Sequence, residues 1–242
     1  MILVAKGVPL SSINGDNVDL WHGELAVVES AYQHYWPLLD ATERTHAGKL
    51  ANPLLRQRYV EVHGRLRGVL SRYLGQPPEQ INIKKAPHGK PYLADYPGLA
   101  FNLSHTANNL MIAVAQNCQL GVDIEHCKPR SNLALLVGKC FADVEAAYWH
   151  QLPESEKTVA FYCFWTKKEA FVKATGRGIA LGLKACVIDP ANPGMFLNLP
   201  DDYGQTSAWR IADINLPCGQ PLCGALVRNK AIANINLFDF RD

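Results

Sequence analysis

The sequence lacks the features that mark several large classes of protein. None of its seven cysteines forms a CxxC pair, and no cysteines and histidines have the spacing of a zinc site. No apolar run approaches the roughly 20 residues that a bilayer-spanning helix needs. The N-terminus has no charged region followed by a long apolar stretch, which a secretory signal requires. We therefore expect a soluble protein of the cytoplasm that does not bind a membrane.

A large excess of charge of either sign is also missing. The 24 Lys and Arg residues nearly balance the 22 Asp and Glu residues, which leaves a formal charge of +2 over 242 residues. A broad nucleic-acid-binding surface is thereby excluded. Apolar neighbours predict reduced, buried thiols in a cytosolic protein at four positions, namely Cys127, Cys140, Cys163 and Cys186.

Low-complexity tracts and short repeats are absent, and the remaining pattern predicts a mixture of helices and strands. Helices are expected over 41–49, 54–74, 133–150 and 154–175. Strands are expected over 18–28, 81–83, 91–93, 100–103, 110–115, 120–125, 184–188, 207–214, 222–227 and 233–237. Each half of the chain therefore reads as a strand, helices and then several strands. This predicts an α+β fold of two similar lobes, 1–119 and 120–242.

Two carboxylates end one of the apolar strands. Asp123 and Glu125 alternate in Leu120-Gly-Val-Asp-Ile-Glu, so both side chains point to the same face. Neighbouring carboxylates repel unless they are protonated or bridged by a cation, and hard oxygen donors of this kind suit Mg²⁺. An isolated pair of this type is more often a solvated strand end.

The long helix 154–175 carries a further carboxylate and a cation. Glu169 and Lys173 lie four residues apart on one face, and Trp165 shares that face. Such a pair is commonly a surface ion pair. The flanking aromatic residues argue against full exposure of the pair. A partly buried Glu169 could supply a metal ligand, and Lys173 could contact a phosphate.

Polar and basic residues also follow the strands of the first half. Ser104 and His105 lie at a strand end, where their side chains point in opposite directions, which favours phosphate binding over a Ser-His nucleophile pair. A hydrogen-bonded turn histidine is the commoner alternative for His105. Lys90 lies in a tight Gly-Lys-Pro turn that could hold a phosphate, and Arg58 presents a cation from helix 54–74. Scattered basic residues often serve only solubility.

Taken together, these segments resemble the Sfp-type 4'-phosphopantetheinyl transferases. The resemblance covers roughly residues 40 to 180 and rests on four motifs in register: Gly89-Lys90-Pro91, Phe101-Asn102-Leu103-Ser104-His105, Gly121-Val122-Asp123-Ile124-Glu125, and Trp165-Thr166-Lys167-Lys168-Glu169-Ala170 continuing to Lys173 and Gly176-x-Gly178. It implies a pseudo-two-fold pair of α+β lobes with coenzyme A bound in the cleft between them. The C-terminal lobe would then carry most of the metal ligands.

The resemblance also implies roles for individual residues. Three carboxylates would hold Mg²⁺ against the pyrophosphate of coenzyme A: Asp123, Glu125 and Glu169. Mn²⁺ suits the same oxygen ligands. Lys173 would contact a phosphate oxygen. The nucleotide part of coenzyme A and its 3'-phosphate would be bound by Arg58, Lys90, Ser104 and His105.

The implied reaction moves 4'-phosphopantetheine to a serine of an apo acyl or peptidyl carrier protein and releases 3',5'-ADP. Glu169 is the candidate base for the serine hydroxyl, and Lys173 would stabilise the transition state. The partner would be a small acidic carrier, and one chain with two lobes suffices as a monomer. Segment 127–141, with leucines among basic residues, either meets that carrier or packs inside the second lobe.

Two other functions compete with this interpretation. A magnesium-dependent nuclease also uses carboxylates and a lysine, but it normally sets Glu and Lys two apart on a strand. A non-catalytic protein that binds coenzyme A or a carrier is the second, and the presence of all three carboxylates and Lys173 speaks against it.

Overall fold

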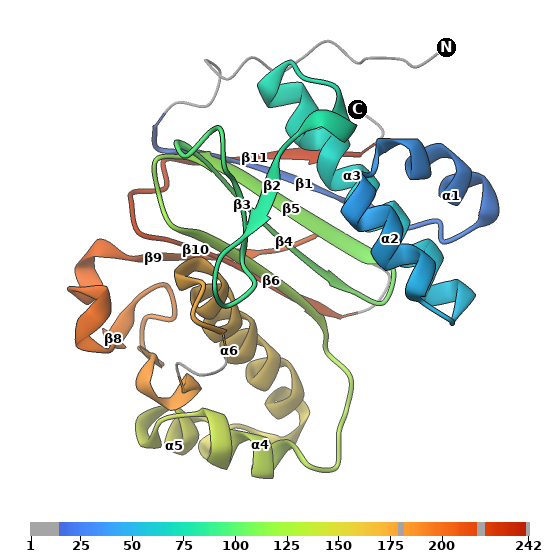
Figure 1. Cartoon of the computed structure of the whole chain (residues 1–242). Helices are drawn as coiled ribbons and strands as arrows, with labels where there is room; N and C mark the ends of the chain where they lie inside the picture. The colour runs from blue at the N-terminus through green and yellow to red at the C-terminus, as the bar shows by residue number, and fades with distance from the viewer. Residues whose placement is uncertain (1–14, 179–181, 217–220, 241–242) are drawn as a thin grey trace.

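The computed structural model describes residues 15–178, 182–216 and 221–240, which form an α+β fold around two main sheets (Figure 1). The first sheet has the strand order β11-β1-β5-β4 and the second has the order β6-β10-β9. Their strands are β1 (Asn17–Glu24), β4 (Leu99–Thr106), β5 (Asn109–Gln116), β6 (Leu120–His126), β9 (Arg210–Ile214), β10 (Leu222–Arg228) and β11 (Asn234–Asp239). Two short antiparallel pairs are formed by β2 (Ile83–Lys85) with β3 (Pro91–Leu93) and by β7 (Val187–Ile188) with β8 (Phe196–Asn198).

Two long helices dominate the helical content. The α-helices are α1 (Glu29–Tyr35), α2 (Ala41–Lys49), α3 (Pro53–Leu74), α4 (Leu133–Cys140), α5 (Asp143–Gln151) and α6 (Glu154–Thr175). Short 3₁₀ turns occur at Trp36–Leu38, Pro78–Gln80, Leu183–Ala185, Asp201–Tyr203 and Thr206–Ala208. Helices α3 and α6 confirm the predictions for 54–74 and 154–175. Each ends at a glycine in the left-handed region, Gly75 with φ 64° and Gly176 with φ 70°, where a side chain would be strained.

The two sheets stack on each other between α3 and α6. Alternate residues of β5 divide between the two faces of the first sheet: Ile112 packs toward α3, whereas Met111 packs toward the second sheet. On β10, Leu226 faces the first sheet and Ala225 faces α6. Period-two alternation therefore produces a layered arrangement of helix, sheet, sheet and helix.

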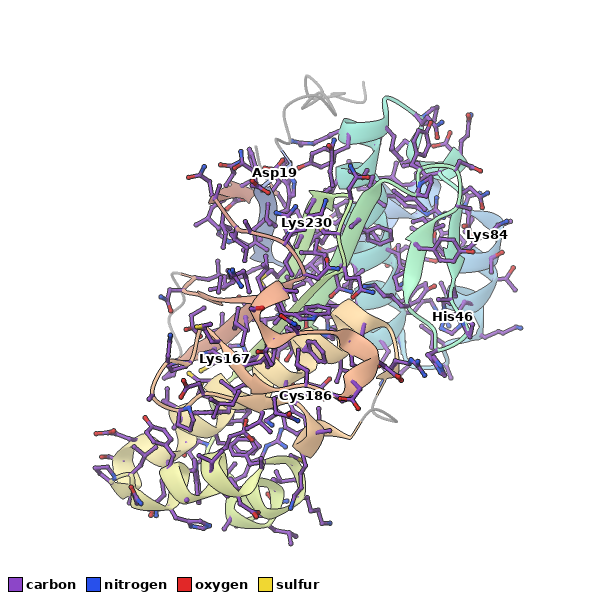
Figure 2. All side chains as sticks on the ribbon, turned by 90° about the vertical axis from the view of Figure 1, so that its left-hand side faces the viewer. Asp19, His46, Lys84, Lys167, Cys186 and Lys230 are labelled. Carbon is purple, nitrogen blue, oxygen red and sulfur yellow. The ribbon has the colours of Figure 1, made fainter. Side chains whose placement is uncertain are left out.

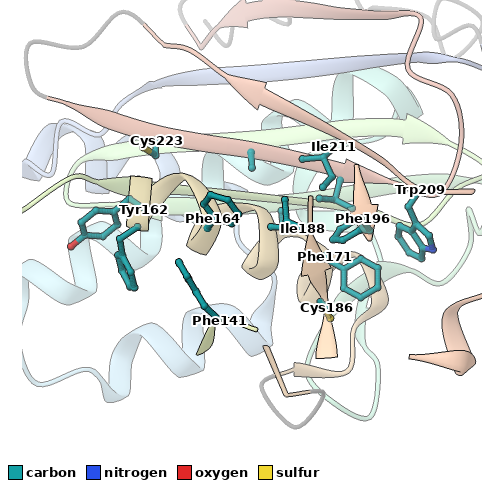
Figure 3. Packing of buried hydrophobic residues seen from close by; sticks show 14 of the residues in the cluster. Phe141, Tyr162, Phe164, Phe171, Cys186, Ile188, Phe196, Trp209, Ile211 and Cys223 are labelled. Carbon is teal, nitrogen blue, oxygen red and sulfur yellow. The ribbon is translucent and has the colours of Figure 1, made fainter. Parts of the chain in front are cut away.

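Aromatic side chains fill the space between α6 and the elements that surround it. Figure 3 shows Phe141, Phe164 and Phe171 in this cluster, with Trp209 at its edge. The Phe171 and Trp209 rings lie 4.7 Å apart between centroids in an edge-on arrangement. This core fixes α6, and with it the polar residues that the opposite side of the helix presents.

The range 133–150 is helical as predicted, but two helices occupy it rather than one. Phe141 and Ala142 have extended backbone between α4 and α5. The Glu145 carboxylate accepts a hydrogen bond from the Ala142 N–H at 2.7 Å and so starts a new helix. Glu145 also forms a buried ion pair with Lys168 of α6 at 2.8 Å. The ion pair with Lys168 therefore fixes Glu145 at the start of α5, where the helical range breaks.

The predicted strand over 18–28 ends early, at Glu24. The two carboxylate oxygens of Glu61 accept hydrogen bonds from the N–H groups of Ala26 and Val27, at 2.9 and 2.8 Å. Those donors are therefore withdrawn from the sheet, and Val27 adopts a φ of 49°. The helix α1 that follows was not predicted.

Several predicted strands have other bounds in the structure, and the last strand pairs with the first one rather than with its sequence neighbours. β7 keeps only the end of 184–188, β9 lacks the first residues of 207–214, and β2 begins at Ile83. β11 runs parallel to β1, so the last strand joins the sheet that begins with the first one. Across the described residues, no helix combines the length and apolar character needed to cross a bilayer.

Candidate active site

The candidate site lies where an edge strand of each main sheet meets the other. The Asn102 amide oxygen on β4 accepts a hydrogen bond from the Val122 N–H on β6 at 2.9 Å. Further along, Thr106 Oγ1 donates to Glu125 Oε2 at 2.9 Å. These contacts join two strands that belong to different sheets, and they bring the polar end of β4 to the carboxylates of β6.

Close packing of β6 against α6 depends on a glycine. A Cβ atom added to Gly121 would lie 2.0 Å from the Ala170 carbonyl oxygen and 2.4 Å from the Ala174 nitrogen. Only glycine permits that approach. Asp123 and Glu125 follow on the same face of β6, because side chains alternate along a strand. Gly121 therefore lets the helix lie close to both carboxylates.

Asp123, Ser104 and Lys173 form the centre of the site. The Lys173 ammonium lies 2.7 Å from Asp123 Oδ1 and 2.8 Å from Ser104 Oγ. Ser104 Oγ donates to the same Asp123 oxygen at 2.8 Å. Asp123 and Ser104 are buried, whereas Lys173 is partly open to solvent. Three elements thus contribute one side chain each to a charged, mostly dry contact.

The other two predicted carboxylates lie within electrostatic range of this centre. Burial raises the pKa of Glu169, and the negative charges of Asp123 and Glu125 raise it further, while Lys173 opposes them. A carboxyl group with a raised pKa holds a proton more readily than usual. The cluster therefore concentrates negative charge, which Lys173 partly offsets.

Two observations bear on whether these residues fit a divalent cation. Asp123 Oδ2 is buried and has no hydrogen-bond partner, which is costly for a carboxylate oxygen unless something else binds it. Within the described ranges, no three or more His, Cys, Asp and Glu side chains form a ready-made metal cage. Mg²⁺ does not need one, since it is commonly held by one or two carboxylates together with water and substrate phosphates. The donor set and the unpaired oxygen fit that cation.

A cavity of about 700 Å³ opens beside the site. Glu169 and Lys173 form one part of its wall, together with Gly176 and Gly178 from the segment after α6. Residues of the N-terminal helices and of the β2–β3 turn form the other part, among them His46, Tyr59, His63, Lys85, His88, Gly89 and Lys90. Figure 2 shows His46 on the side of the N-terminal helices and Lys167 on the side of α6. The cavity thus lies between the two regions of the chain.

Three aromatic residues of the cavity wall were not predicted from the sequence, namely His46, Tyr59 and His63. His46 contacts the Tyr59 ring, and Tyr59 stacks on His63 with ring centroids 3.8 Å apart. Tyr59 and His63 are four residues apart on α3, so their shared face was a signal available in the sequence. Nothing local, however, places His46 of α2 beside them.

The two remaining predicted cations, Lys90 and Arg58, contact other groups than the central Asp123. Lys90 lines the cavity, but its ammonium donates to the carbonyl oxygens of Leu120 and Ala174, at 3.0 and 2.6 Å. Burial lowers the pKa of Lys90 to about 8. Arg58 donates to the Asn108 side-chain oxygen at 3.0 Å. These cations are near the site without touching its centre.

Ser104 and His105 point in opposite directions, as the strand predicts. Ser104 is buried against Asp123, whereas His105 is exposed. Partial desolvation lowers the pKa of His105, and the positive charges of Arg58 and Lys173 lower it further. A nucleophilic Ser-His pair is therefore not formed.

Segment 127–141 has both of the properties considered for it. Leu133 is buried in the core and Leu136 packs against it, while Leu135 is 58% exposed. Lys128 and Arg130 of the same segment are exposed. The segment therefore contributes to the second core and also exposes one apolar and two basic side chains.

Comparisons with known proteins agree on one family. The sequence model described as the 4'-phosphopantetheinyl transferase superfamily matches residues 119–226. The 4'-phosphopantetheinyl transferase HetI of Nostoc sp. strain PCC 7120 is 34% identical over 210 residues, which cover 85% of this chain and 86% of that protein. The 4'-phosphopantetheinyl transferase Sfp of Bacillus subtilis strain 168 is 30% identical over 140 residues, 57% of this chain and 61% of Sfp. The 4'-phosphopantetheinyl transferase AcpT of Salmonella typhimurium is 31% identical over 148 residues, 59% of this chain and 74% of AcpT.

Proposed function

The chain belongs to the 4'-phosphopantetheinyl transferase superfamily, and on that premise we propose that it moves the 4'-phosphopantetheine arm of coenzyme A to a serine of an apo carrier protein. The observation that carries the proposal is the meeting of Ser104, Asp123 and Lys173 beside Glu169 at the wall of the cavity. A magnesium-dependent nuclease and a non-catalytic binder explain family membership less well.

In the proposed reaction, the carrier serine oxygen attacks the β-phosphorus of coenzyme A. The bond from that phosphorus to the bridging oxygen breaks, and 3',5'-ADP leaves. Glu169, which lines the cavity beside Lys173, accepts the proton of the serine hydroxyl. Lys173 donates hydrogen bonds to the phosphoryl oxygens as their negative charge increases.

Asp123, Glu125 and Glu169 would hold Mg²⁺, which supplies Lewis-acid stabilisation of the pyrophosphate. The unpaired, buried Asp123 Oδ2 supports this role. Mn²⁺ would suit the same oxygen ligands. Because Lys173 already contacts Asp123 Oδ1, the two oxygens of one carboxylate have different partners, and Oδ2 is the one left for a metal.

We propose that coenzyme A occupies the 700 Å³ cavity. Arg58 and His105 would approach the 3'-phosphate, and Ser104 and Lys173 the pyrophosphate. Lys90 and the β2–β3 turn would also contact the nucleotide part of coenzyme A. The two hydrogen bonds from Lys90 to carbonyl oxygens hold this turn in position.

The second substrate would be an acidic acyl or peptidyl carrier protein that meets Leu135 and the nearby cations of segment 127–141. We further propose that the protein works as a monomer in the cytoplasm. The six described cysteines are free thiols, the state that a reducing compartment maintains. All proposed site residues come from one chain.

We propose that the fold consists of two pseudo-symmetric lobes, 1–119 and 120–242. Each would be organised by a helix of 22 residues, α3 in one and α6 in the other. Both helices pack on the outer face of a sheet and both end at a left-handed glycine. β11 would then be a strand of the second lobe that extends the sheet of the first.

The deciding experiment is intact mass spectrometry of several apo carrier proteins after incubation with this protein, coenzyme A and Mg²⁺. We expect at least one carrier to gain one phosphopantetheine group. Asp123→Asn should abolish the gain, because it removes the charge of the proposed metal ligand while keeping its shape. Asp95→Asn is the matched control, since Asp95 is exposed in the turn after β3 and should leave transfer intact.

Two negative results would point in different directions. Binding of coenzyme A without transfer to any carrier would favour a non-catalytic protein. Transfer that is equally fast in the Asp123→Asn variant would leave the function in place and would refute the role of Asp123.

A further inference from the structure

Three cysteine side chains from separate parts of the chain meet beside β10. Cys223 Sγ lies 3.1 Å from Cys127 Sγ and 3.1 Å from Cys163 Sγ. Cys127 follows β6, and Cys163 lies on α6. Cys223 is on β10 and is labelled in Figure 3. All three are free thiols. We refer to these three residues as the thiol cluster.

The geometry places Cys223 between two possible disulfide partners. A disulfide has an S–S length of about 2.05 Å, so each pair needs to approach by only about 1 Å. Cys223 has a single sulfur atom, and it can therefore bond to one neighbour at a time. The spacing of the cysteines along the chain does not indicate this contact, because 96 and 60 residues separate the two pairs.

The exposure of each thiol determines which of them meets an oxidant first. Cys127 and Cys163 are half-buried, whereas Cys223 is 7% exposed. A small oxidant therefore reaches the two outer thiols first. The hydrogen bond from Cys223 lowers the pKa of Cys163 despite its partial burial, which favours the thiolate form that reacts.

We propose that the thiol cluster is an oxidation site for hydroperoxides, with Cys223 as the obligatory partner in the disulfide. An outer thiol loses its proton and its sulfur attacks one peroxide oxygen. The O–O bond breaks, the sulfur is oxidised to sulfenic acid, and the other oxygen takes up the released proton and leaves as water or an alcohol. The Cys223 sulfur then attacks the sulfenic sulfur, the S–O bond breaks, and the hydroxyl takes up the proton of the Cys223 thiol and leaves as water. Two thiols are oxidised and one peroxide is reduced.

A soft metal ion is a less suitable occupant of the cluster. Taking the described residues together, no group of three or more cysteine, histidine or acidic side chains is arranged to hold a metal ion. Oxidation needs only two sulfur atoms at a time, and each of the two close pairs provides them.

Either disulfide would join β10 to an element of the candidate active site. Cys127 lies two residues after Glu125, and Cys163 is on the helix that carries Glu169. The proposal does not depend on the transferase function, because its test reads the sulfur chemistry directly.

The test is peptide mapping by mass spectrometry after oxidation of the full chain. The reduced protein, freed of reductant, is treated with hydrogen peroxide, and the remaining thiols are alkylated before digestion. We expect a cross-linked peptide that joins Cys223 to Cys163 or to Cys127, lighter than the two reduced peptides by two hydrogen atoms. Dithiothreitol should reverse it.

Variants separate the cluster from the other cysteines. Cys223→Ser should abolish both cross-links, and Cys163→Ser should leave only the one between Cys127 and Cys223. Cys118→Ser is the matched control, because Cys118 is also half-buried but makes no sulfur–sulfur contact in the part of the chain that the structure describes. A disulfide that omits Cys223, or none in the wild-type protein under conditions that oxidise a free thiol peptide, would overturn the proposal. The wild-type result decides even where Cys223→Ser does not fold.

Discussion

At the scale of single residues, burial determines the chemistry that the candidate site can offer. Asp123 is 5% exposed and receives two hydrogen bonds on one oxygen, while its second oxygen has no partner. Glu169, on α6, has a raised pKa because burial and two neighbouring carboxylates disfavour its charge. Lys173 is the cation that stabilises both.

Replacement of Lys173 by alanine should separate binding from catalysis. We expect turnover of carrier phosphopantetheinylation to fall about 100-fold or more, because the ammonium would stabilise charge that develops only in the transition state. Binding of coenzyme A, measured by calorimetry, should weaken by less than about tenfold. Lys157→Ala is the control, because Lys157 is a half-buried lysine near the start of the same helix that pairs with Glu154 away from the site. Equal losses in both quantities would mean that Lys173 only binds substrate.

His63 should make the fold sensitive to acid. Burial lowers its pKa from 6.5 to about 4, so the folded state keeps the ring neutral where the unfolded chain takes up a proton. Its contribution is complete above about pH 6.5 and is lost as the pH falls toward 4, with roughly 2 kcal/mol lost by about pH 5. The measurement is the free energy of unfolding in urea, for wild type and His63→Gln, at about pH 6.5 and about pH 5.

In that experiment, His63→Gln should show a smaller loss of stability on acidification than wild type. His34→Gln, which changes an exposed histidine of α1, should behave like wild type. An identical pH dependence in wild type and His63→Gln would contradict the assignment.

At the scale of elements, the distance between α6 and β6 decides whether the site exists. Gly121 is the contact point, since any Cβ there would collide with the backbone of Ala170 and Ala174. Backbone atoms cannot move aside as a side chain can. Close packing of β6 on α6 therefore keeps Asp123 and Glu125 near Glu169.

Gly121→Ala should destabilise the protein by about 3 kcal/mol, because the added methyl group separates β6 from α6. Gly138→Ala is the matched control. A Cβ at Gly138, on α4, meets no heavy atom within 4 Å, and alanine there should stabilise the helix by up to about 1 kcal/mol. Denaturant unfolding measures both. A neutral Gly121→Ala would show that the two elements do not pack this closely.

At the scale of the whole molecule, the chain end closes the first sheet. β11 pairs with β1 in parallel, and Phe238 stacks on Trp21 with ring centroids 4.6 Å apart. The Asn236 amide also donates to Asp19 Oδ1 at 2.8 Å. These contacts connect residues more than 200 positions apart, so the first and the last described strands belong to one sheet.

Deletion of residues 231–242 should therefore cost roughly 3 kcal/mol or more, because it removes a stacked aromatic residue and a complete strand. The newly exposed edge of β1 should also promote association between molecules. Deletion of 241–242 alone is the control. Thermal unfolding together with light scattering measures both effects, and an unchanged melting temperature with no association would refute the role of β11.

The sequence alone determined the parts of the protein that depend on near neighbours. Helices 54–74 and 154–175 followed from residues three and four positions apart, and the shared face of Asp123 and Glu125 followed from strand alternation. The order of the motifs was sufficient to identify the family. These properties are local, so the chain contains the information without its fold.

Only the tertiary structure decided which of those parts meet. It placed Lys173 against Ser104 and Asp123, directed the Lys90 ammonium to two carbonyl oxygens, and paired Glu145 with Lys168 where the helical range 133–150 breaks. It also brought Cys223 between Cys127 and Cys163. The physical reason is that such contacts join residues tens of positions apart, and their geometry is set by how sheets and helices pack rather than by any periodicity along the chain.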